Sequence, residues 1–194
     1  MLLENIEEHI HCIKSIANLS STIDEIGNLI LTTLLSENKI MICGNGGSAA
    51  DAQHFSSELL GRFVTDRQPL AALALTTDSS ALTCIGNDYA FKEVFARQVI
   101  GLGKAGDILF LISTSGNSEN LVQAAKAAHK LGIRVVSLLG NNGGQLLSHS
   151  DVSAVVASKV TARIQEAHIL IIHSLCAIVE VEYANRGIVT NDGI

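Results

Sequence analysis

The sequence predicts a doubly wound α/β fold, in which helices cover both faces of a five-stranded parallel sheet and a helical segment comes first. Three observations support this prediction. Five short apolar runs recur along the chain, segments with helical spacing separate them, and the runs are continuously apolar rather than alternating. Continuous apolar strands are typical of parallel sheets that are buried on both faces.

The first 36 residues are predicted to form two helices. Apolar side chains recur at helical spacing over 6–17 and again over 23–34. Between these sets, Thr22 is followed three residues later by Glu25, a capping-box pattern that predicts the start of the second helix. We expect one domain over residues 1–194, with helices over 1–36 and an α/β core over 37–194, because about 150 residues per domain is usual.

The core is predicted to alternate between strands and helices. The predicted strands are KIMICG, LAALAL, DILFLIS, IRVVSLL and DVSAVVA, at 39–44, 70–75, 107–113, 133–139 and 151–157. The helix-compatible segments are 48–62, 91–102, 118–131 and 161–184. The only proline, Pro69, stands just before the second strand, where it interrupts no ladder.

The composition limits the classes of function. Hydrophobic residues make up 47% of the chain and charged residues 16%, so we expect apolar surface that meets other subunits. The net charge of −6 gives no attraction to nucleic acid. We expect no membrane span, and the acidic start MLLENIEEHI does not resemble a secretory signal. The four scattered cysteines predict neither disulfides nor a zinc ribbon, which fits a cytoplasmic protein.

Ligands of doubly wound sheets bind beyond the carboxyl ends of the strands, so the loops at those ends are the candidates for a binding site. The loop STSGNS follows the third strand and holds the hydroxyls of Ser113, Thr114, Ser115 and Ser118. Because a helix N-terminus carries unpaired N–H groups and partial positive charge, this loop can bind an anion without a basic side chain. A simple turn whose hydroxyl caps the helix fits the same residues.

The loop after the first strand, CGNGGS, is rich in glycine and allows a ligand to approach the backbone. In the helix that follows, His54 and Glu58 are four residues apart and share one face. Such a pair can hold a divalent metal ion or supply a general base. An exposed polar pair on a solvated face is the alternative.

The last helix carries Gln165 and His173, which lie about 80° apart around its axis. His173 is flanked by Ile171 and Ile172, so a buried core histidine is the simplest interpretation of it, and His168 has the same interpretation.

Taken together, GNGGSAADAQHFSSELLGRF, CIGNDYAF, STSGNSEN and RIQEAHILIIH resemble the sugar-isomerase (SIS) domain family and, within it, the phosphoheptose isomerases. The resemblance covers nearly the whole chain. It implies a flavodoxin-like five-stranded parallel sheet in a cytoplasmic, zinc-dependent homotetramer. It also implies conversion of sedoheptulose 7-phosphate into a heptose 7-phosphate for lipopolysaccharide or related glycans.

The resemblance assigns roles to residues at matching positions. It implies a phosphate site at Ser113, Thr114, Ser115 and Ser118, and sugar contacts at Asn45, Gly46, Gly47, Ser48, Asn87 and Asp88. The implied ligands of one zinc ion are His54, Glu58, Gln165 and His173, with Glu58 and Gln165 also meeting substrate. Moving a carbonyl from C2 to C1 through an enediol needs a base such as Glu58, while His173 can exchange protons with the oxygens.

One position departs from many phosphoheptose isomerases, which have aspartate where this chain has Ala162. Alanine there resembles the paralogous regulator that binds the replication initiator DnaA. That regulator lacks counterparts of Glu58 and His173, and this chain keeps both. A DnaA-binding regulator and a non-catalytic sensor of sugar phosphates are the two alternatives to an isomerase.

Overall fold

The computed structural model describes residues 1–185, so the end of the predicted domain, 186–194, lies outside the described residues. The sheet is parallel and its strands lie in the order β2-β1-β3-β4-β5. This arrangement confirms the predicted fold class. The strands are β1 (Ile40–Gly44), β2 (Ala72–Ala74), β3 (Ile108–Ser113), β4 (Arg134–Gly140) and β5 (Val152–Val156).

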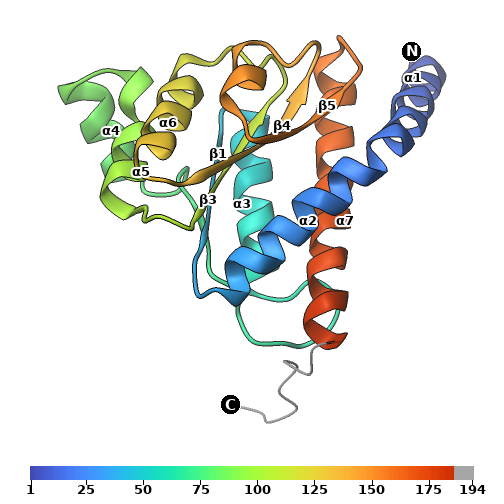
Figure 1. The fold of residues 1–194 in the computed structure, drawn as a ribbon. Helices are drawn as coiled ribbons and strands as arrows, with labels where there is room; N and C mark the ends of the chain where they lie inside the picture. The colour runs from blue at the N-terminus through green and yellow to red at the C-terminus, as the bar shows by residue number, and fades with distance from the viewer. Residues whose placement is uncertain (186–194) are drawn as a thin grey trace.

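Helices cover both faces of this sheet (Figure 1). One face packs against α2 (Ser20–Leu35), α3 (Gly47–Leu60) and α7 (Thr161–Asn185), and α1 (Leu2–Ser15) continues from that layer through the 3-10 turn η1 (Ile16–Leu19). The opposite layer consists of the remaining helical elements. These are α4 (Ser79–Asp88), η2 (Phe91–Glu93), α5 (Ala96–Leu102), α6 (Glu119–Lys130) and η3 (Gln145–His149).

The strand residues alternate between two cores. Ile42 and Phe110 join the core under α2, α3 and α7, whereas Met41 and Leu109 join the core under α5 and α6. All four side chains are fully buried. The strands are therefore apolar at every position because each face of the sheet has its own hydrophobic core.

The helical lead corrects one prediction. The second helix begins at Ser20, so Thr22 lies inside it, and no side chain caps its start. Ser15, Ile16 and Ser20 all keep right-handed helical dihedrals, and the chain passes from α1 to α2 almost without interruption. A capping box is needed only where a helix starts from extended chain, which is why the Thr22–Glu25 pattern was misleading here.

Two other elements differ from the prediction. The second strand spans three residues instead of 70–75, because β2 is an edge strand that pairs with β1 alone. The predicted helix 91–102 is divided into η2 and α5, and helix α4 was not predicted. Asp78 caps α4 by accepting a hydrogen bond from the N–H of Ala81 at 2.9 Å, a local signal that the sequence did contain.

The long helix α7 corrects the expectation that no segment is apolar enough to cross a membrane. By length and composition alone, Thr161–Ala184 is long and apolar enough to cross a membrane, since its most apolar stretch has a mean hydropathy of 1.5. Half of that stretch is buried inside the protein, where α7 packs against α2 and α3. The helix is therefore explained as the core helix of the α/β fold.

The strand order places the most important loops side by side. The chain adds β2 on one side of β1 and β3 on the other, so the direction of winding reverses between β1 and β3. Ligands of such folds bind beyond the carboxyl ends of the strands at this reversal. The glycine loop (Asn45–Ser48) and the anion loop (Ser113–Ser118) both begin there.

Candidate functional site

The candidate site lies along the interface between α3 and α7, which run side by side in the same direction (Figure 1). At its upper end, the side chain of Gln165 lies directly against Gly47, where any added Cβ would collide with it. Two turns further along both helices, His54 faces His173. Because the pairs advance by seven and eight residues, the two helices remain in register over this distance.

His54, Glu58 and His173 form what we call the histidine cluster. Their ligand atoms all lie within 4.8 Å of one another. The Nε2 atoms of His54 and His173 are 2.9 Å apart, and Nε2 of His54 is 3.3 Å from Oε1 of Glu58. The side chains are half-buried, with 40% of His54 and 19% of Glu58 exposed. His173 is only half-buried, so its interpretation as a buried core histidine is wrong. His54 and Glu58 do form a partly exposed i,i+4 pair, and His173 joins it from α7.

The cluster suits a metal ion by its chemistry. Two imidazole nitrogens and one carboxylate oxygen are a donor set that zinc accepts, and three protein ligands leave a position for substrate. Ligand atoms around a tetrahedral zinc are about 3.4 Å apart if the bonds are about 2.0–2.1 Å long. Two of the three separations, 2.9 and 3.3 Å, are near this value, and all three ligand atoms lie within 4.8 Å of one another.

Asp51 lies one turn before His54 on the same helix. Its Oδ2 is buried and has no hydrogen-bond partner within the described chain. Burial raises the pKa of this carboxyl to about 6, and the nearby His54 acts in the opposite direction. A buried polar atom without a partner is unusual in proteins and often accompanies a bound ion or water, which is consistent with a ligand site on this part of α3.

The anion loop is held by its own hydroxyls. Oγ of Ser113 accepts a hydrogen bond from the N–H of Gly116 at 3.0 Å, and Oγ of Ser115 accepts one from the N–H of Asn117 at 3.2 Å. Both hydroxyls still have a proton to donate. Gly116 has φ of +65°, a left-handed conformation that suits glycine.

Ser118 is the N-cap residue of α6, yet its side chain makes no capping hydrogen bond. The interpretation of the loop as a turn with a capping hydroxyl therefore lacks its central contact. The Ser118 hydroxyl remains available for another partner at the start of this helix, where an anion is favoured.

A pair of asparagines joins the glycine loop to the anion loop. The side-chain amides of Asn45 and Asn120 exchange two hydrogen bonds, of 3.0 and 2.8 Å, and Asn120 is only 3% exposed. The two loops are thereby fixed relative to each other across the winding reversal. Asn120 is part of the STSGNSEN motif, but its partner is 75 residues away, so sequence inspection did not identify the pair.

Asn87 and Asp88 lie apart from this arrangement. They end helix α4 on its exposed surface, where the Asn87 amide donates to Asp88 at 2.8 Å. Hydrogen bonds from Asn87 and Cys84 lower the pKa of Asp88. Within residues 1–185, their side chains form hydrogen bonds with one another and with Cys84, and none with the histidine cluster or the anion loop. Their predicted contact with the sugar remains a prediction.

The lower end of the α3–α7 interface contains a second group that sequence reasoning missed. Arg67 donates to the carbonyls of Glu58 and Leu59 at 2.7 and 2.9 Å, and its Nε lies 3.8 Å from Oε1 of Glu180. Arg67 therefore caps the end of α3 and holds the backbone of Glu58. Nothing in the local sequence around Arg67 indicates these contacts, because they form only when the chain returns from α3 to β2.

Comparison with known proteins agrees with this geometry. The model of the SIS domain family matches residues 5–140. Phosphoheptose isomerase from Campylobacter concisus is 48% identical over 180 residues, covering 93% of this chain and 95% of its own, and that from Coxiella burnetii is 55% identical, covering 84% and 83%. The solved structure of phosphoheptose isomerase GmhA from Neisseria gonorrhoeae is 46% identical and superposes with a TM-score of 0.89, covering 93% of this chain and 97% of its own.

Proposed function

Because this chain belongs to the SIS domain family and, within it, to the phosphoheptose isomerases, we propose that it converts sedoheptulose 7-phosphate into D-glycero-D-manno-heptose 7-phosphate. The observation that carries this function is the meeting of His54, Glu58 and His173 within 4.8 Å between α3 and α7. An acid–base pair and a metal-binding donor set then occupy the same place. An aldose–ketose isomerization needs both a proton carrier and a stabiliser of negative charge on oxygen.

In the proposed reaction, Glu58 removes a proton from the carbon next to the substrate carbonyl and returns it to the neighbouring carbon, through an enediol. His173 exchanges protons with the two substrate oxygens. Its orientation is held by the close approach of its ring to His54 and by the tilted ring of Phe63, whose centroid lies 5.7 Å from that of His173. Arg67 contributes by fixing the backbone of Glu58.

The metal in this proposal is zinc, held by His54, Glu58, Gln165 and His173. When bound, zinc supplies a Lewis acid that stabilises negative charge on the substrate oxygens. Glutamine is a weak ligand for zinc, so Gln165 is the member of the set that can exchange with substrate. A carboxylate that coordinates metal is a weaker base, and we therefore assign ligation and proton removal by Glu58 to different steps.

The substrate phosphate in this proposal binds the anion loop, through Ser113, Thr114, Ser115 and Ser118. The sugar contacts the glycine loop at Asn45, Gly46, Gly47 and Ser48, together with Asn87, Asp88 and Gln165. The free hydroxyl of Ser118 and the amide bridge between Asn45 and Asn120 support this assignment. Together they provide a preformed pair of loops beyond β1 and β3, where the fold favours ligand binding.

We further propose one SIS domain per chain and a cytoplasmic homotetramer that feeds heptose into lipopolysaccharide or related glycans, without contact to nucleic acid or membrane. Exposed apolar side chains support an oligomer. Leu2, Leu3 and Ile6 on α1 are 73%, 74% and 43% exposed, and α1 reaches beyond the rest of the fold (Figure 1). Apolar surface of this kind is typical of a subunit interface.

Turnover of sedoheptulose 7-phosphate by the purified protein tests the function. Activity should be lost after chelation and return with graded addition of zinc, because the histidine cluster supplies most of the proposed ligands. Ala162→Asp, which restores the aspartate of many relatives, should alter the rate without abolishing the zinc response, since Ala162 is neither a proposed ligand nor a proton carrier.

Two outcomes would overturn parts of this proposal. If neither the wild type nor Ala162→Asp turns over substrate at any zinc concentration, the isomerase assignment is wrong and the regulator of the same fold replaces it. If activity is indifferent to the chelator, the enzyme works through Glu58 and His173 alone and the zinc assignment is wrong.

A further inference from the structure

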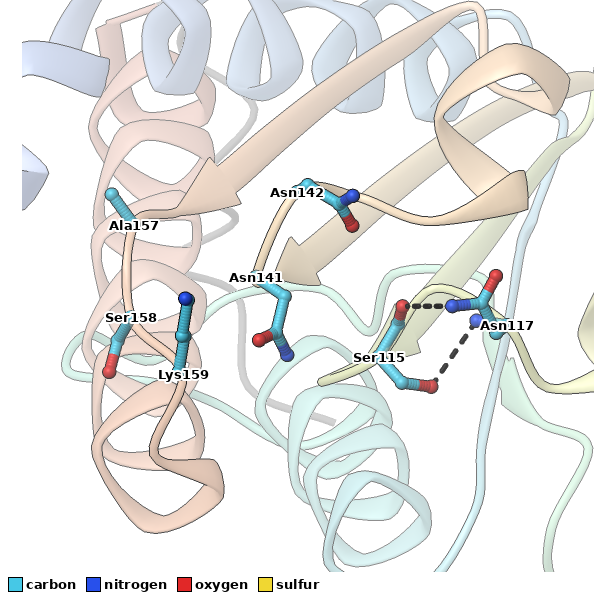
Figure 2. A pocket seen from close by; sticks show the side chains of 7 residues that line it. All are labelled: Ser115, Asn117, Asn141, Asn142, Ala157, Ser158 and Lys159. Atoms are coloured by element: carbon cyan, nitrogen blue, oxygen red, sulfur yellow. Dashed lines mark hydrogen bonds between the residues drawn. The ribbon is translucent and has the colours of Figure 1, made fainter.

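A pocket of about 590 Å³ opens beside the anion loop, at the carboxyl ends of β3, β4 and β5. Figure 2 shows its walls: Ser115 and Asn117 on one side, Ala157, Ser158 and Lys159 on the opposite side, and Asn141 and Asn142 between them. Its volume is within the range of about 300–1,000 Å³ that small-molecule sites occupy. Five of its seven lining residues come from the loops after β4 and β5, to which the sequence assigned no function.

The pocket has a positive charge and no negative one. Lys159 is the only ionised residue among those that line it, although the whole chain carries a net charge of −6. Within residues 1–185, the lysines that form ion pairs are Lys39 and Lys92, so the Lys159 ammonium has no carboxylate partner. An unpaired cation facing neutral polar groups attracts an anionic ligand.

The walls of the pocket are fixed before any ligand arrives. The side-chain amide of Asn141 donates to the carbonyl of Thr114 at 2.9 Å, and its backbone N–H donates to the carbonyl of Ser158 at 3.1 Å. Asn141 therefore ties the loops after β3, β4 and β5 together. It does so with φ of +55°, a conformation that non-glycine residues rarely adopt and that is concentrated at functional sites.

The lining groups define a class of ligand. Ser115 and Ser158 offer hydroxyls, and Asn117, Asn141 and Asn142 offer amides that can both donate and accept. Hydroxyls and amides of this kind recognise the hydroxyl groups of a sugar, whereas the ammonium recognises a phosphoryl group. A phosphorylated polyhydroxy compound matches both requirements.

We propose that Lys159 is a specificity residue of the substrate site, and that the phosphoryl group of the sugar binds between Lys159 and the anion loop. The inference rests on the proposed function for the identity of the sugar, but its chemistry follows from the pocket. The anion loop lacks a basic side chain of its own, and Lys159 reaches the same pocket from the loop before α7. Ser115 belongs to both the loop and the pocket and joins the two.

The test compares Lys159→Met with Lys159→Arg and with a matched control, Lys126→Met. Lys126 is an exposed lysine on α6 that lines a different pocket. In Lys159→Met we expect KM for sedoheptulose 7-phosphate to rise about tenfold, because a charge-assisted hydrogen bond is lost from a partly solvated site. We expect kcat to be unchanged, Lys159→Arg to recover most of the loss, and Lys126→Met to match the wild type.

Inorganic phosphate provides a second readout that does not depend on turnover. Its dissociation constant, measured by calorimetry, should rise by a similar factor in Lys159→Met, and the salt dependence of binding should become weaker. If KM and phosphate affinity in Lys159→Met both equal the wild-type values, the inference is wrong. Phosphate binding that depends on Lys159 in a protein without isomerase activity would support the inference and overturn only the proposed function.

Discussion

The α3–α7 interface carries two clusters of ionisable side chains, and they differ in how their polar groups are satisfied. At the lower end, Arg67 is 3% exposed and Glu180 is 9% exposed. Arg67 donates to three backbone carbonyls, and Glu180 accepts from the N–H groups of Val64 and Thr65. Opposite charges face each other, and the backbone supplies most of the remaining partners.

The histidine cluster is built on the same two helices, but its side chains make fewer hydrogen bonds within the described chain than those of Arg67 and Glu180. Two imidazoles meet at 2.9 Å, so at most one hydrogen bond joins them, and 40% of His54 remains exposed. Among the residues that the structure describes, the carboxylate of Glu58 has one side-chain partner, His54. The difference teaches that buried charge does not by itself indicate a ligand site. A ligand site is indicated where several side chains that can bind a metal ion or carry a proton converge and lack partners within the chain.

The largest effect should come from the histidine cluster. We expect Glu58→Gln to lower kcat by about 10²–10⁴-fold, because one positioned general base is lost, while substrate binding is mostly retained. Its stability should change little, since no backbone group depends on this carboxylate. Steady-state kinetics and thermal unfolding measure the two effects, with Glu25→Gln on the exposed face of α2 as the control. Wild-type kcat in Glu58→Gln would show that Glu58 is not the base.

Substitution in the Arg67–Glu180 pair should instead change the stability of the fold. We expect Arg67→Met to lower the free energy of unfolding by roughly 3–5 kcal/mol, because Glu180 would remain as an unpaired buried charge. The double variant Arg67→Met/Glu180→Leu should recover part of this loss. Denaturant unfolding measures both, and Arg134→Met, an exposed arginine at the start of β4, should stay within about 0.5 kcal/mol of the wild type. If the denaturant midpoint of Arg67→Met equals that of the wild type, the pair does not stabilise the fold and the contrast with the histidine cluster is wrong.

The anion loop extends the comparison to a third region, since its hydroxyls are also only partly satisfied. We expect Thr114→Ala to raise KM by about ten- to a hundredfold, the effect of losing a hydrogen bond to a charged group worth roughly 1.5–3 kcal/mol. Sedoheptulose without its phosphate should be a very poor substrate for the wild type. Thr32→Ala, on the exposed surface of α2, is the control. Equal efficiency with and without the phosphate would refute the assignment of this loop.

The smallest effect concerns His168, which lies on α7 like His173 but is fully buried. Its Nε2 lies 3.2 Å from the carbonyl of Leu139, and burial lowers its pKa to about 4. Between about pH 6.5 and 4 the unfolded chain binds a proton that the folded chain does not. Stability should therefore decrease as pH falls through this range, by roughly 1–3 kcal/mol, with no contribution above pH 7.

His168→Gln isolates this contribution, because glutamine does not titrate. Unfolding curves at several pH values should show a weaker pH dependence in the variant than in the wild type. If the two stability profiles run parallel, His168 is protonated equally in the folded and unfolded states, and the predicted pH effect is wrong.

The sequence by itself determined the sheet and the positions of its loops. Five continuous apolar runs predicted five parallel strands, because buried strands must be apolar on both faces. His54 and Glu58 could be placed on one helix face from their spacing alone. The failures were local: the Thr22–Glu25 pattern predicted a cap where the chain was already helical, and α4 was overlooked despite its Asp78 cap.

Only the tertiary structure decided which residues meet across long sequence distances. His54 and His173 are 119 residues apart, Asn45 and Asn120 are 75 apart, and Arg67 and Glu180 are 113 apart. Lys159 similarly becomes significant only because Asn141 ties three loops around one pocket. Periodicity and turn chemistry act within a few residues, whereas these contacts depend on how strands are ordered and helices are packed. The strand order and helix packing therefore determine which of the chemically capable side chains form the site.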